Sequence, residues 1–241
     1  YFTAFICLFP SKLAVFFLKI IGHQVDWSSS IGFSIILSKK ITLKKNTRIG
    51  HFNFISINDA HFMNKAYIGH LNIIKGPFSL VLKEEGAIGN GNSITRGNYG
   101  VTYGKSKLHL GALTKITSKH KIDLTKSIII EDFSILAGSG SQIWTHGYIH
   151  APKGPGRIRI DGEVHIKNNV YIGSNCVINA GVTIAKGITV GSNSSVSKDL
   201  IKQGMYVSQP LRFVEKNIND VTNNLEKIID KNLVENVYKK K

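Results

Sequence analysis

The sequence predicts an all-β solenoid, in which short strands from successive coils stack as parallel sheets. Its main signature is a strict six-residue recurrence of aliphatic residues, at Ile160, Ile166, Ile172, Ile178, Ile184, Val190 and Val196. An α-helix needs apolar residues at a period near 3.6 and an amphipathic strand at a period of two, so neither explains a period of six. A solenoid does, because each block supplies one strand and one turn and three blocks close a triangular coil.

Two further columns of the repeat agree with a solenoid. The fourth position mostly holds Gly or Asn, which tolerate the positive φ of a tight turn. Its members are Glu163, Asn169, Asn175, Gly181, Gly187, Asn193 and Asp199. The fifth position holds residues small or aliphatic enough for a narrow interior, namely Val164, Val170, Cys176, Val182, Ile188, Ser194 and Leu200.

Residues 1–30 form an apolar N-terminal segment. Polar residues and a proline between positions 10 and 19 interrupt it before it reaches the roughly 20 residues of a membrane span. Ser11 is expected to cap a short helix in which Leu13, Phe16, Phe17 and Ile20 share a face. That face either packs on the solenoid end or a neighbouring subunit, or associates peripherally with a membrane.

The solenoid itself is expected over residues 31–212. The six-residue repeat starts at Ile31, and slips in it predict three small excursions, near Asn58–Asn64, Glu84–Gly86 and Tyr99–Lys107. After Leu136 the pattern fails at Gln142 and resumes at Ile160, leaving a loop at residues 143–159. Long ordered loops in repeat proteins commonly carry function.

Residues 213–241 are expected to form a C-terminal α-helix with a basic tail. Apolar residues recur at helical spacing from Phe213 to Val237, and Lys239–Lys241 follow. The helix would cap the open edge of the solenoid or pack in an oligomer, because uncapped parallel strands invite aggregation.

The composition favours an anionic partner. The formal charge is +16 and the isoelectric point is near 9.8, so the protein attracts anions. Nucleic acid is disfavoured, because no recognised nucleic-acid-binding motif accompanies the dispersed lysines. An acidic polysaccharide, the phosphates of coenzyme A or an anionic membrane leaflet fit at least as well.

The cysteines indicate a reducing compartment. Cys7 and Cys176 are far apart and form no disulfide framework or zinc-ligand spacing. We therefore expect a cytoplasmic protein, at the inner face of the membrane if residues 1–30 associate with it.

The late coils, GSNCVINAGVTIAKGITVGSNSSVSKDL, resemble the hexapeptide-repeat acyltransferases of the sugar O-acetyltransferase type. This resemblance is strong from about residue 142 to residue 212. It implies a left-handed parallel β-helix, although the general rule for parallel crossovers would favour the right-handed form. It also implies a homotrimer, acetyl-CoA as the donor, a sugar or polysaccharide acceptor, and no metal.

His146 is the candidate general base. Thr145-His146 ahead of Tyr171-Ile172-Gly173 resembles the family pattern, in which the histidine acts at a cleft between two subunits. Acyl transfer to a hydroxyl needs a base for the hydroxyl proton, and a placed imidazole contributes about 10²–10⁴-fold. Spacing alone leaves His150 as an alternative base.

Further residues are candidate contacts to the two substrates. The acceptor candidates are Trp144, Tyr148, His150, Arg157 and Tyr171. For coenzyme A, the resemblance implies backbone contacts at Ser174 and Ser192, a Ser197-Lys198 pair near the nucleotide, and a basic contact from Arg212. Positive groups there pair with phosphates.

Three rival functions remain. The same base could serve N-acetylation of an amino sugar or a nucleotide sugar. A non-catalytic β-helix scaffold would have no need of a histidine in an irregular loop. A zinc site like that of the γ-type carbonic anhydrases is disfavoured, because its histidine pair is separated by four residues, whereas His146 and His150 are separated by three and lack a third ligand.

Overall fold

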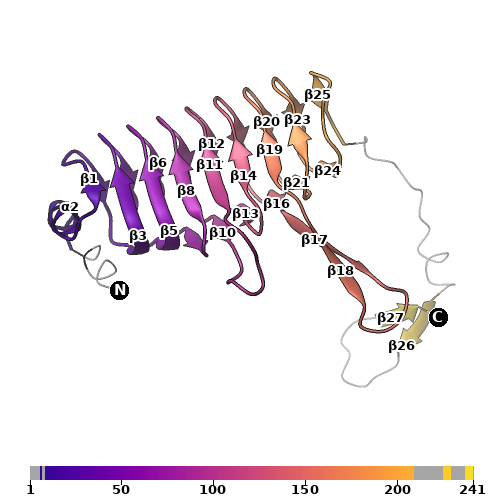
Figure 1. Cartoon of the computed structure of the whole chain (residues 1–241). Helices are drawn as coiled ribbons and strands as arrows, with labels where there is room; N and C mark the ends of the chain where they lie inside the picture. Colours follow the sequence, from indigo (N-terminus) through magenta and orange to yellow (C-terminus); the bar gives the residue numbers. More distant parts are fainter. Residues whose placement is uncertain (1–5, 7–8, 209–224, 229–236, 241) are drawn as a thin grey trace. The chain divides into compact units, whose positions relative to one another are not determined.

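The computed structural model describes residue 6 and residues 9–208, 225–228 and 237–240. The chain divides into two units, residues 1–208 and residues 209–241. The first is a left-handed parallel β-helix, which confirms the predicted fold class (Figure 1). Successive coils pair in parallel on three faces, here called A, B and C.

Face A is a nine-stranded sheet with one strand per coil. Its strands are β2 (Ser30–Ile31), β4 (Arg48–Ile49), β6 (Tyr67–Ile68), β9 (Ala87–Ile88), β12 (Lys115–Ile116), β15 (Ile135–Leu136), β20 (Tyr171–Ile172), β23 (Thr189–Val190) and β25 (Met205–Tyr206).

Faces B and C are the two arms of a second sheet, joined by two long strands that turn the corner between them, β3 (Ile35–Leu43) and β5 (Phe54–Phe62). Face B continues with β7 (Ile73–Lys75), β10 (Ser93–Thr95), β13 (Lys121–Asp123), β16 (Gln142–Ile143), β21 (Val177–Ile178) and β24 (Ser195–Val196). Face C contains β1 (Gln24–Val25), β8 (Ser79–Leu82), β11 (Lys107–Leu110), β14 (Ile128–Ile130), β19 (Val164–Ile166) and β22 (Thr183–Ile184).

The six-residue repeat gives the core and the turns their regular form. On face A, Leu136, Ile172 and Val190 are in register on successive coils and are buried. Each such side chain stabilises the fold by about 1.5–3 kcal/mol through burial. Asn169 and Asn193 adopt the positive φ predicted for the fourth position.

The assignment of Ile160 to the core column is wrong. Ile160 is 51% exposed and lies outside the coil. Ile143 occupies the inner position instead, paired with Ile122 and Ile178 on the adjacent coils. The spacing from Leu136 to Ile143 is seven positions rather than six, and the positive φ angles of Gly138 and Gly140 accommodate the extra residue.

One of the three predicted excursions is confirmed. Residues 96–106 leave the coil between β10 and β11. The prediction of an excursion at Asn58–Asn64 is wrong, because β5 continues without a break to Phe62. The one at Glu84–Gly86 is also wrong, because that stretch is an ordinary tight turn with Glu85 at a φ of 55°.

The predicted loop at residues 143–159 is an ordered hairpin. Its antiparallel strands are β17 (His146–His150) and β18 (Arg157–Asp161), and it projects from the solenoid between β16 and β19 (Figure 1). Residues 96–106 and this hairpin both leave the solenoid where face B turns into face C, here called the BC corner.

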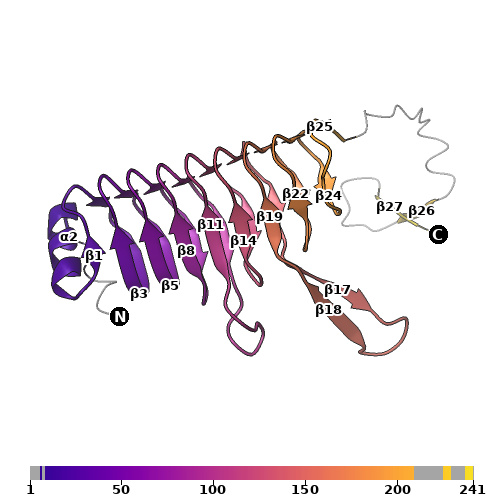
Figure 2. The ribbon, with the colours of Figure 1, turned by 45° about the horizontal axis from the view of Figure 1, so that its top comes forward.

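An α-helix, α2 (Ser11–Ile20), packs against β1 and β2 at the N-terminal end of the solenoid (Figure 2). Ala14, Val15 and Leu18 are its buried residues. Ser11 is not the cap that the sequence predicted: Pro10 holds the cap position, and Ser11 Oγ accepts a hydrogen bond from the Ile31 backbone N–H at 2.9 Å. No helix of the described residues is long and apolar enough to cross a membrane.

The described part of the second unit differs from the predicted helix. β26 (Leu225–Ile228) pairs in antiparallel fashion with β27 (Val237–Lys240), so the helix prediction is wrong over these residues. The segment is rich in asparagine, a weak helix former, and in Val and Ile, which favour strands. The rest of the predicted helix lies outside the described residues.

A ladder of buried polar side chains runs along the corner between faces A and B. Asn72 Nδ2 donates to Asn53 Oδ1 at 2.9 Å, and Asn92 Nδ2 donates to Asn72 Oδ1 at 3.1 Å. Asn92 Oδ1 then accepts from the His120 backbone N–H at 3.0 Å, and His120 Nδ1 from the Ser141 N–H at 3.1 Å. The ladder satisfies buried polar groups that would otherwise destabilise the coils.

Candidate active site

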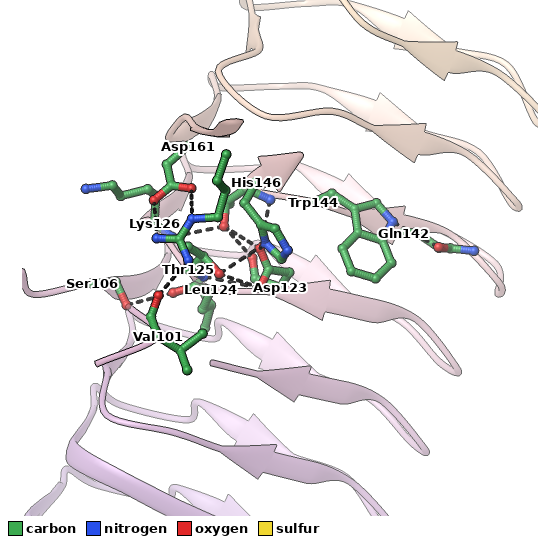
Figure 3. Close-up of polar contacts among 12 residues, drawn as sticks. Val101, Ser106, Asp123, Leu124, Thr125, Lys126, Gln142, Trp144, His146 and Asp161 are labelled. Carbon is green, nitrogen blue, oxygen red and sulfur yellow. Dashed lines mark hydrogen bonds and ion pairs between the residues drawn. The ribbon is translucent and has the colours of Figure 1, made fainter. Parts of the chain in front are cut away.

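The candidate base stands where the hairpin leaves the BC corner. His146 is the first residue of β17, and Asp123 is the last residue of β13 on the preceding coil. Ile122 and Ile143 are register partners, which places Asp123 beside the Thr145-His146 step. Figure 3 shows the His146 ring and the Asp123 carboxylate facing each other.

The Asp123 carboxylate accepts several hydrogen bonds. Its Oδ2 atom lies 2.9 Å from His146 Nδ1, and it accepts from the Thr145 backbone N–H at 3.0 Å and from Thr145 Oγ1 at 2.7 Å. Its Oδ1 atom accepts from Thr125 Oγ1 at 2.9 Å. The Asp123 side chain is 11% exposed and that of His146 is 25% exposed, so the pair is largely shielded from water.

The network fixes both the charge of Asp123 and the tautomer of His146. Burial would raise the pKa of the Asp123 carboxyl, but hydrogen bonds from Thr145, His146 and Thr125 outweigh it and lower that pKa. An ionised carboxylate only accepts hydrogen bonds, so we assign the imidazole proton to Nδ1. Nε2 of His146 therefore keeps a lone pair and can act as a base.

A row of aromatic rings follows His146 along β17. The His146 ring makes edge contacts with Trp144 and Tyr148, at centroid distances of 6.2 and 5.8 Å. Tyr148 makes a further edge contact with His150 at 6.4 Å. Alternate residues of a strand share a face, and the Arg157 guanidinium lies 4.9 Å from the centre of the Tyr148 ring. The structure thus brings together the candidate acceptor residues of the hairpin.

The geometry favours His146 over His150 as the candidate base. His150 is exposed and lies four residues along β17 from His146, which is about 13 Å in a β-strand. Its ring contacts Tyr148, whereas the His146 ring is held by a carboxylate. His146 therefore has the partner that a general base needs for orientation.

Arg159 joins the hairpin to the other excursion of the BC corner. Arg159 Nε lies 2.8 Å from Asp161 Oδ1, and the Asp161 side chain is only 5% exposed. A second Arg159 nitrogen donates to the backbone carbonyl of Val101, in the other excursion of the BC corner. Lys126 Nζ lies 3.5 Å from the centre of the Tyr103 ring in that same excursion. The two excursions therefore support each other.

Tyr171, Ser174 and Ser192 lie away from His146 within one chain. Tyr171 is exposed on face A. Ser174 and Ser192 follow face A strands on adjacent coils, and Ser192 Oγ accepts from the Ser174 backbone N–H at 3.2 Å. A single chain thus does not bring these three residues to the candidate base.

Ser197 and Lys198 share the BC corner with His146. They directly follow β24, which is two coils beyond β16, or about 10 Å along the solenoid axis. They border a shallow cavity of about 270 Å³ that Val190, Tyr206 and Val207 also line. Arg212 lies outside the described residues.

Asp123 and Thr125 are candidate site residues that the sequence did not reveal, and Thr145 was noted only as the neighbour of His146. One signal could have found them: the apolar column places Ile122 and Ile143 on adjacent coils, which puts Asp123 next to the Thr145-His146 step. Using that signal required the correct seven-residue spacing before Ile143.

Other histidines have structural partners. His165 Nε2 lies 2.7 Å from Glu131 Oε1, which Lys167 also contacts. His120 belongs to the buried ladder. In the part of the chain that the structure describes, no group of three or more His, Cys, Asp or Glu residues could hold a metal ion.

Solved structures with a similar fold include hexapeptide-repeat acetyltransferases and other acyltransferases. One is a hexapeptide-repeat acetyltransferase from Vibrio cholerae O1 biovar eltor, complexed with acetyl coenzyme A. It is 23% identical, with a TM-score of 0.44, and the match covers 56% of this chain and 69% of that chain.

Two further structures cover more of the chain. The polysialic acid O-acetyltransferase OatWY is 17% identical with a TM-score of 0.47, and the match covers 82% of this chain and 91% of that one. A mutant of AntD, an N-acyltransferase from Bacillus cereus in complex with dTDP-4-amino-4,6-dideoxyglucose and coenzyme A, is 18% identical with a TM-score of 0.37, covering 86% and 92%. No protein-family model and no curated protein matched the chain.

Proposed function

We propose that this protein is an acetyl-CoA-dependent O-acetyltransferase that acts on a sugar hydroxyl during capsule, lipopolysaccharide or exopolysaccharide synthesis. The observation that carries the proposal is the Asp123–His146 pair, in which a buried carboxylate holds an imidazole with its Nε2 lone pair available. A solenoid used only as a scaffold has no need of this pair.

The pair supports one reaction sequence. His146 Nε2 takes the proton of the acceptor hydroxyl as the hydroxyl oxygen attacks the thioester carbonyl of acetyl-CoA. The tetrahedral intermediate then collapses, the carbon–sulfur bond breaks, and the departing thiolate takes the proton from the imidazolium. The Asp123 carboxylate stabilises the imidazolium while it carries the positive charge.

The donor site is proposed to lie between two subunits of a homotrimer. Tyr171, Ser174 and Ser192 are away from His146 within one chain, so a neighbouring subunit would have to present them. Ser197 and Lys198 occupy the same corner as His146 and would meet the nucleotide end of coenzyme A, where a lysine can pair with phosphate. Arg212 is proposed for the same end.

The hairpin is proposed to bind the acceptor. Trp144 and Tyr148 are exposed aromatic residues beside the candidate base, and such rings provide apolar surface with a polar edge. Arg157 and His150 add cationic or hydrogen-bonding groups along the same strand pair. With a formal charge of +16, this arrangement favours an anionic polysaccharide.

Transfer of labelled acetyl groups tests the function. Purified protein is incubated with acetyl-labelled acetyl-CoA and with capsular, lipopolysaccharide or exopolysaccharide fractions. We expect acetyl transfer that needs acceptor and protein, in an ester that mild alkali or hydroxylamine releases. Label that is stable to both would support N-acetylation of an amino sugar instead. Absence of transfer to every acceptor, with no binding of coenzyme A, would contradict the enzyme assignment and favour the scaffold.

A further inference from the structure

The N-terminal helix α2 is apolar on two sides. One side, formed by Ala14, Val15 and Leu18, is buried against the end of the solenoid. The other side exposes Leu13, Phe16 and Ile20, the last of which is 63% exposed. A helix that only capped the solenoid would have a polar outer side. The exposed apolar side of α2 therefore indicates an interaction surface.

Aromatic and lysine side chains surround the exposed side of α2. The Trp27 ring is 52% exposed and stacks on Phe16 at a centroid distance of 6.4 Å. Lys19 Nζ lies 5.1 Å from the centre of the Trp27 ring, and Lys12 Nζ donates to the Trp27 carbonyl at 2.7 Å. Tryptophan beside lysine is typical of the boundary between lipid and water, where the ring sits at the headgroups and the ammonium reaches water.

The charge at this end of the solenoid is strongly positive. Residues 9–58 contain one acidic residue, Asp26. The basic residues in the same range are Lys12, Lys19, Lys39, Lys40, Lys44, Lys45 and Arg48. The nine residues before Pro10 carry no charge at all. An anionic bilayer surface attracts such a cluster by about 1 kcal/mol for each basic residue near the surface.

We propose that α2 docks the protein on an anionic lipid bilayer. The Leu13, Phe16 and Ile20 side enters the boundary between headgroups and acyl chains, Trp27 lies at the headgroups, and the neighbouring lysines face the lipid phosphates. A second copy of the chain fits this surface less well, because two such basic ends would repel each other. The proposal stands on α2 and its surroundings and does not depend on the proposed enzymatic function.

Membrane docking would set the height of the candidate active site. Five strand-to-strand steps on face B separate β3 in the first coil from β16, which precedes His146. At about 4.8 Å per step this is about 24 Å along the solenoid axis. The hairpin would therefore reach polysaccharide chains that are held close to the membrane surface.

Vesicle flotation tests the docking with a matched pair of variants. The test variant is the double substitution Phe16→Ser and Ile20→Ser. The control is Ile201→Ser and Met205→Ser, which changes two exposed apolar residues at the other end of the solenoid. We expect wild type and control to float with vesicles of phosphatidylglycerol and phosphatidylethanolamine, and the test variant to bind about tenfold less or weaker still.

Lipid composition and salt test the electrostatic part. We expect little flotation with phosphatidylcholine vesicles, and weaker flotation on phosphatidylglycerol when salt rises from about 0.1 to about 0.5 M. In a Trp144→Phe background, the remaining Trp27 should shift its emission to the blue on anionic vesicles and be quenched by brominated lipid.

Three results would overturn the proposal. The first is that wild type does not float with anionic vesicles, and the second is that the test variant floats as well as the control. The test variant could also lose oligomer mass in light scattering while wild type ignores vesicles, which would assign the surface to a second copy. Circular dichroism and acetyl transfer to a soluble acceptor should be unchanged in the test variant, so failure of docking and failure of the proposed function are distinguishable.

Discussion

At the scale of single residues, the pKa of His120 departs furthest from its ordinary value among the described histidines. It is 1% exposed, its Nδ1 atom accepts from the Ser141 backbone N–H, and its Nε2 atom lies 3.0 Å from Thr117 Oγ1. The ring therefore carries its proton on Nε2 and donates it to Thr117. A second proton on Nδ1 would face the Ser141 N–H and place a charge in the core, so the folded chain favours neutral imidazole.

Burial lowers the pKa of His120 to about 4, from an ordinary value of 6.5. Between these two values the unfolded chain binds more protons than the folded one, so His120 stabilises the fold above pH 6.5 and this contribution is lost as the pH falls towards 4. The loss amounts to about 3 kcal/mol. Burial also lowers the pKa values of His23 and His109, which act in the same direction.

His120→Asn tests this titration, because asparagine already serves the ladder at Asn53, Asn72 and Asn92 and does not titrate. We expect the free energy of unfolding of wild type to fall more between pH 7 and pH 4.5 than that of the variant, by about 2 kcal/mol or more. Urea denaturation at the two pH values measures this difference. Equal losses in both proteins would show that His120 does not titrate as the buried geometry requires.

Single residues also show what the sequence could and could not predict about the site. His146 and its aromatic neighbours were predictable, because they form a local pattern beside a repeat. Asp123 was not predicted, since its place beside His146 depends on the pairing of two coils whose spacing changes at Ile143. The partner of a residue in a solenoid is one coil away in space and about twenty residues away in sequence.

At the scale of elements, the hairpin depends on its anchor at Arg159. This residue joins the nearly buried Asp161 to the carbonyl of Val101 in the neighbouring excursion. Removing the guanidinium leaves a shielded carboxylate without its ionic partner, which is costly. The expected consequence is a hairpin that opens more often and presents Trp144 and Tyr148 less consistently.

Arg159→Met tests the anchor by limited proteolysis. We expect trypsin to cleave after Lys153 or Arg157 several-fold faster in the variant, because local opening exposes the hairpin backbone. We also expect kcat/KM for the acceptor to fall about tenfold. Glu85→Ala is the control, since it breaks the exposed Lys65–Glu85 pair, and exposed pairs contribute little. Equal cleavage rates in both variants would show that Arg159 does not hold the hairpin.

The elements were predictable where the repeat is regular. The six-residue spacing predicted the positions of the strands in the late coils, because each block must place an aliphatic residue in the narrow interior. The sequence predicted a loop instead of the hairpin, because the hairpin strands have no buried face. Ile158 and Ile160 are exposed, so these strands lack the alternation of apolar and polar residues that marks a half-buried strand. Helical spacing at Leu225 and Ile228 was also misleading, because an i, i+3 pair in a short apolar run suits either structure.

At the scale of the whole molecule, one chain holds only part of the proposed site. The candidate base, the Asp123 carboxylate and the hairpin belong to the BC corner, whereas Tyr171 and the Ser174–Ser192 pair belong to face A and its following corner. A sequence repeat predicts how a chain coils, because that is decided by its own core. It does not reveal which outer faces meet in an assembly, because outward positions vary freely between coils.

The kcat of His146→Ala, compared with that of His150→Ala, tests the central claim most directly. With an acceptor identified by the labelled-acetyl assay, we expect His146→Ala to keep its fold and its affinity for coenzyme A but to lose about 10²-fold or more in kcat. Asp123→Asn should lose part of the same kcat, because the imidazole is then no longer oriented by a carboxylate. His150→Ala should change mainly the KM of the acceptor. Near wild-type turnover in His146→Ala, with turnover abolished in His150→Ala, would contradict the assignment of His146 as the base.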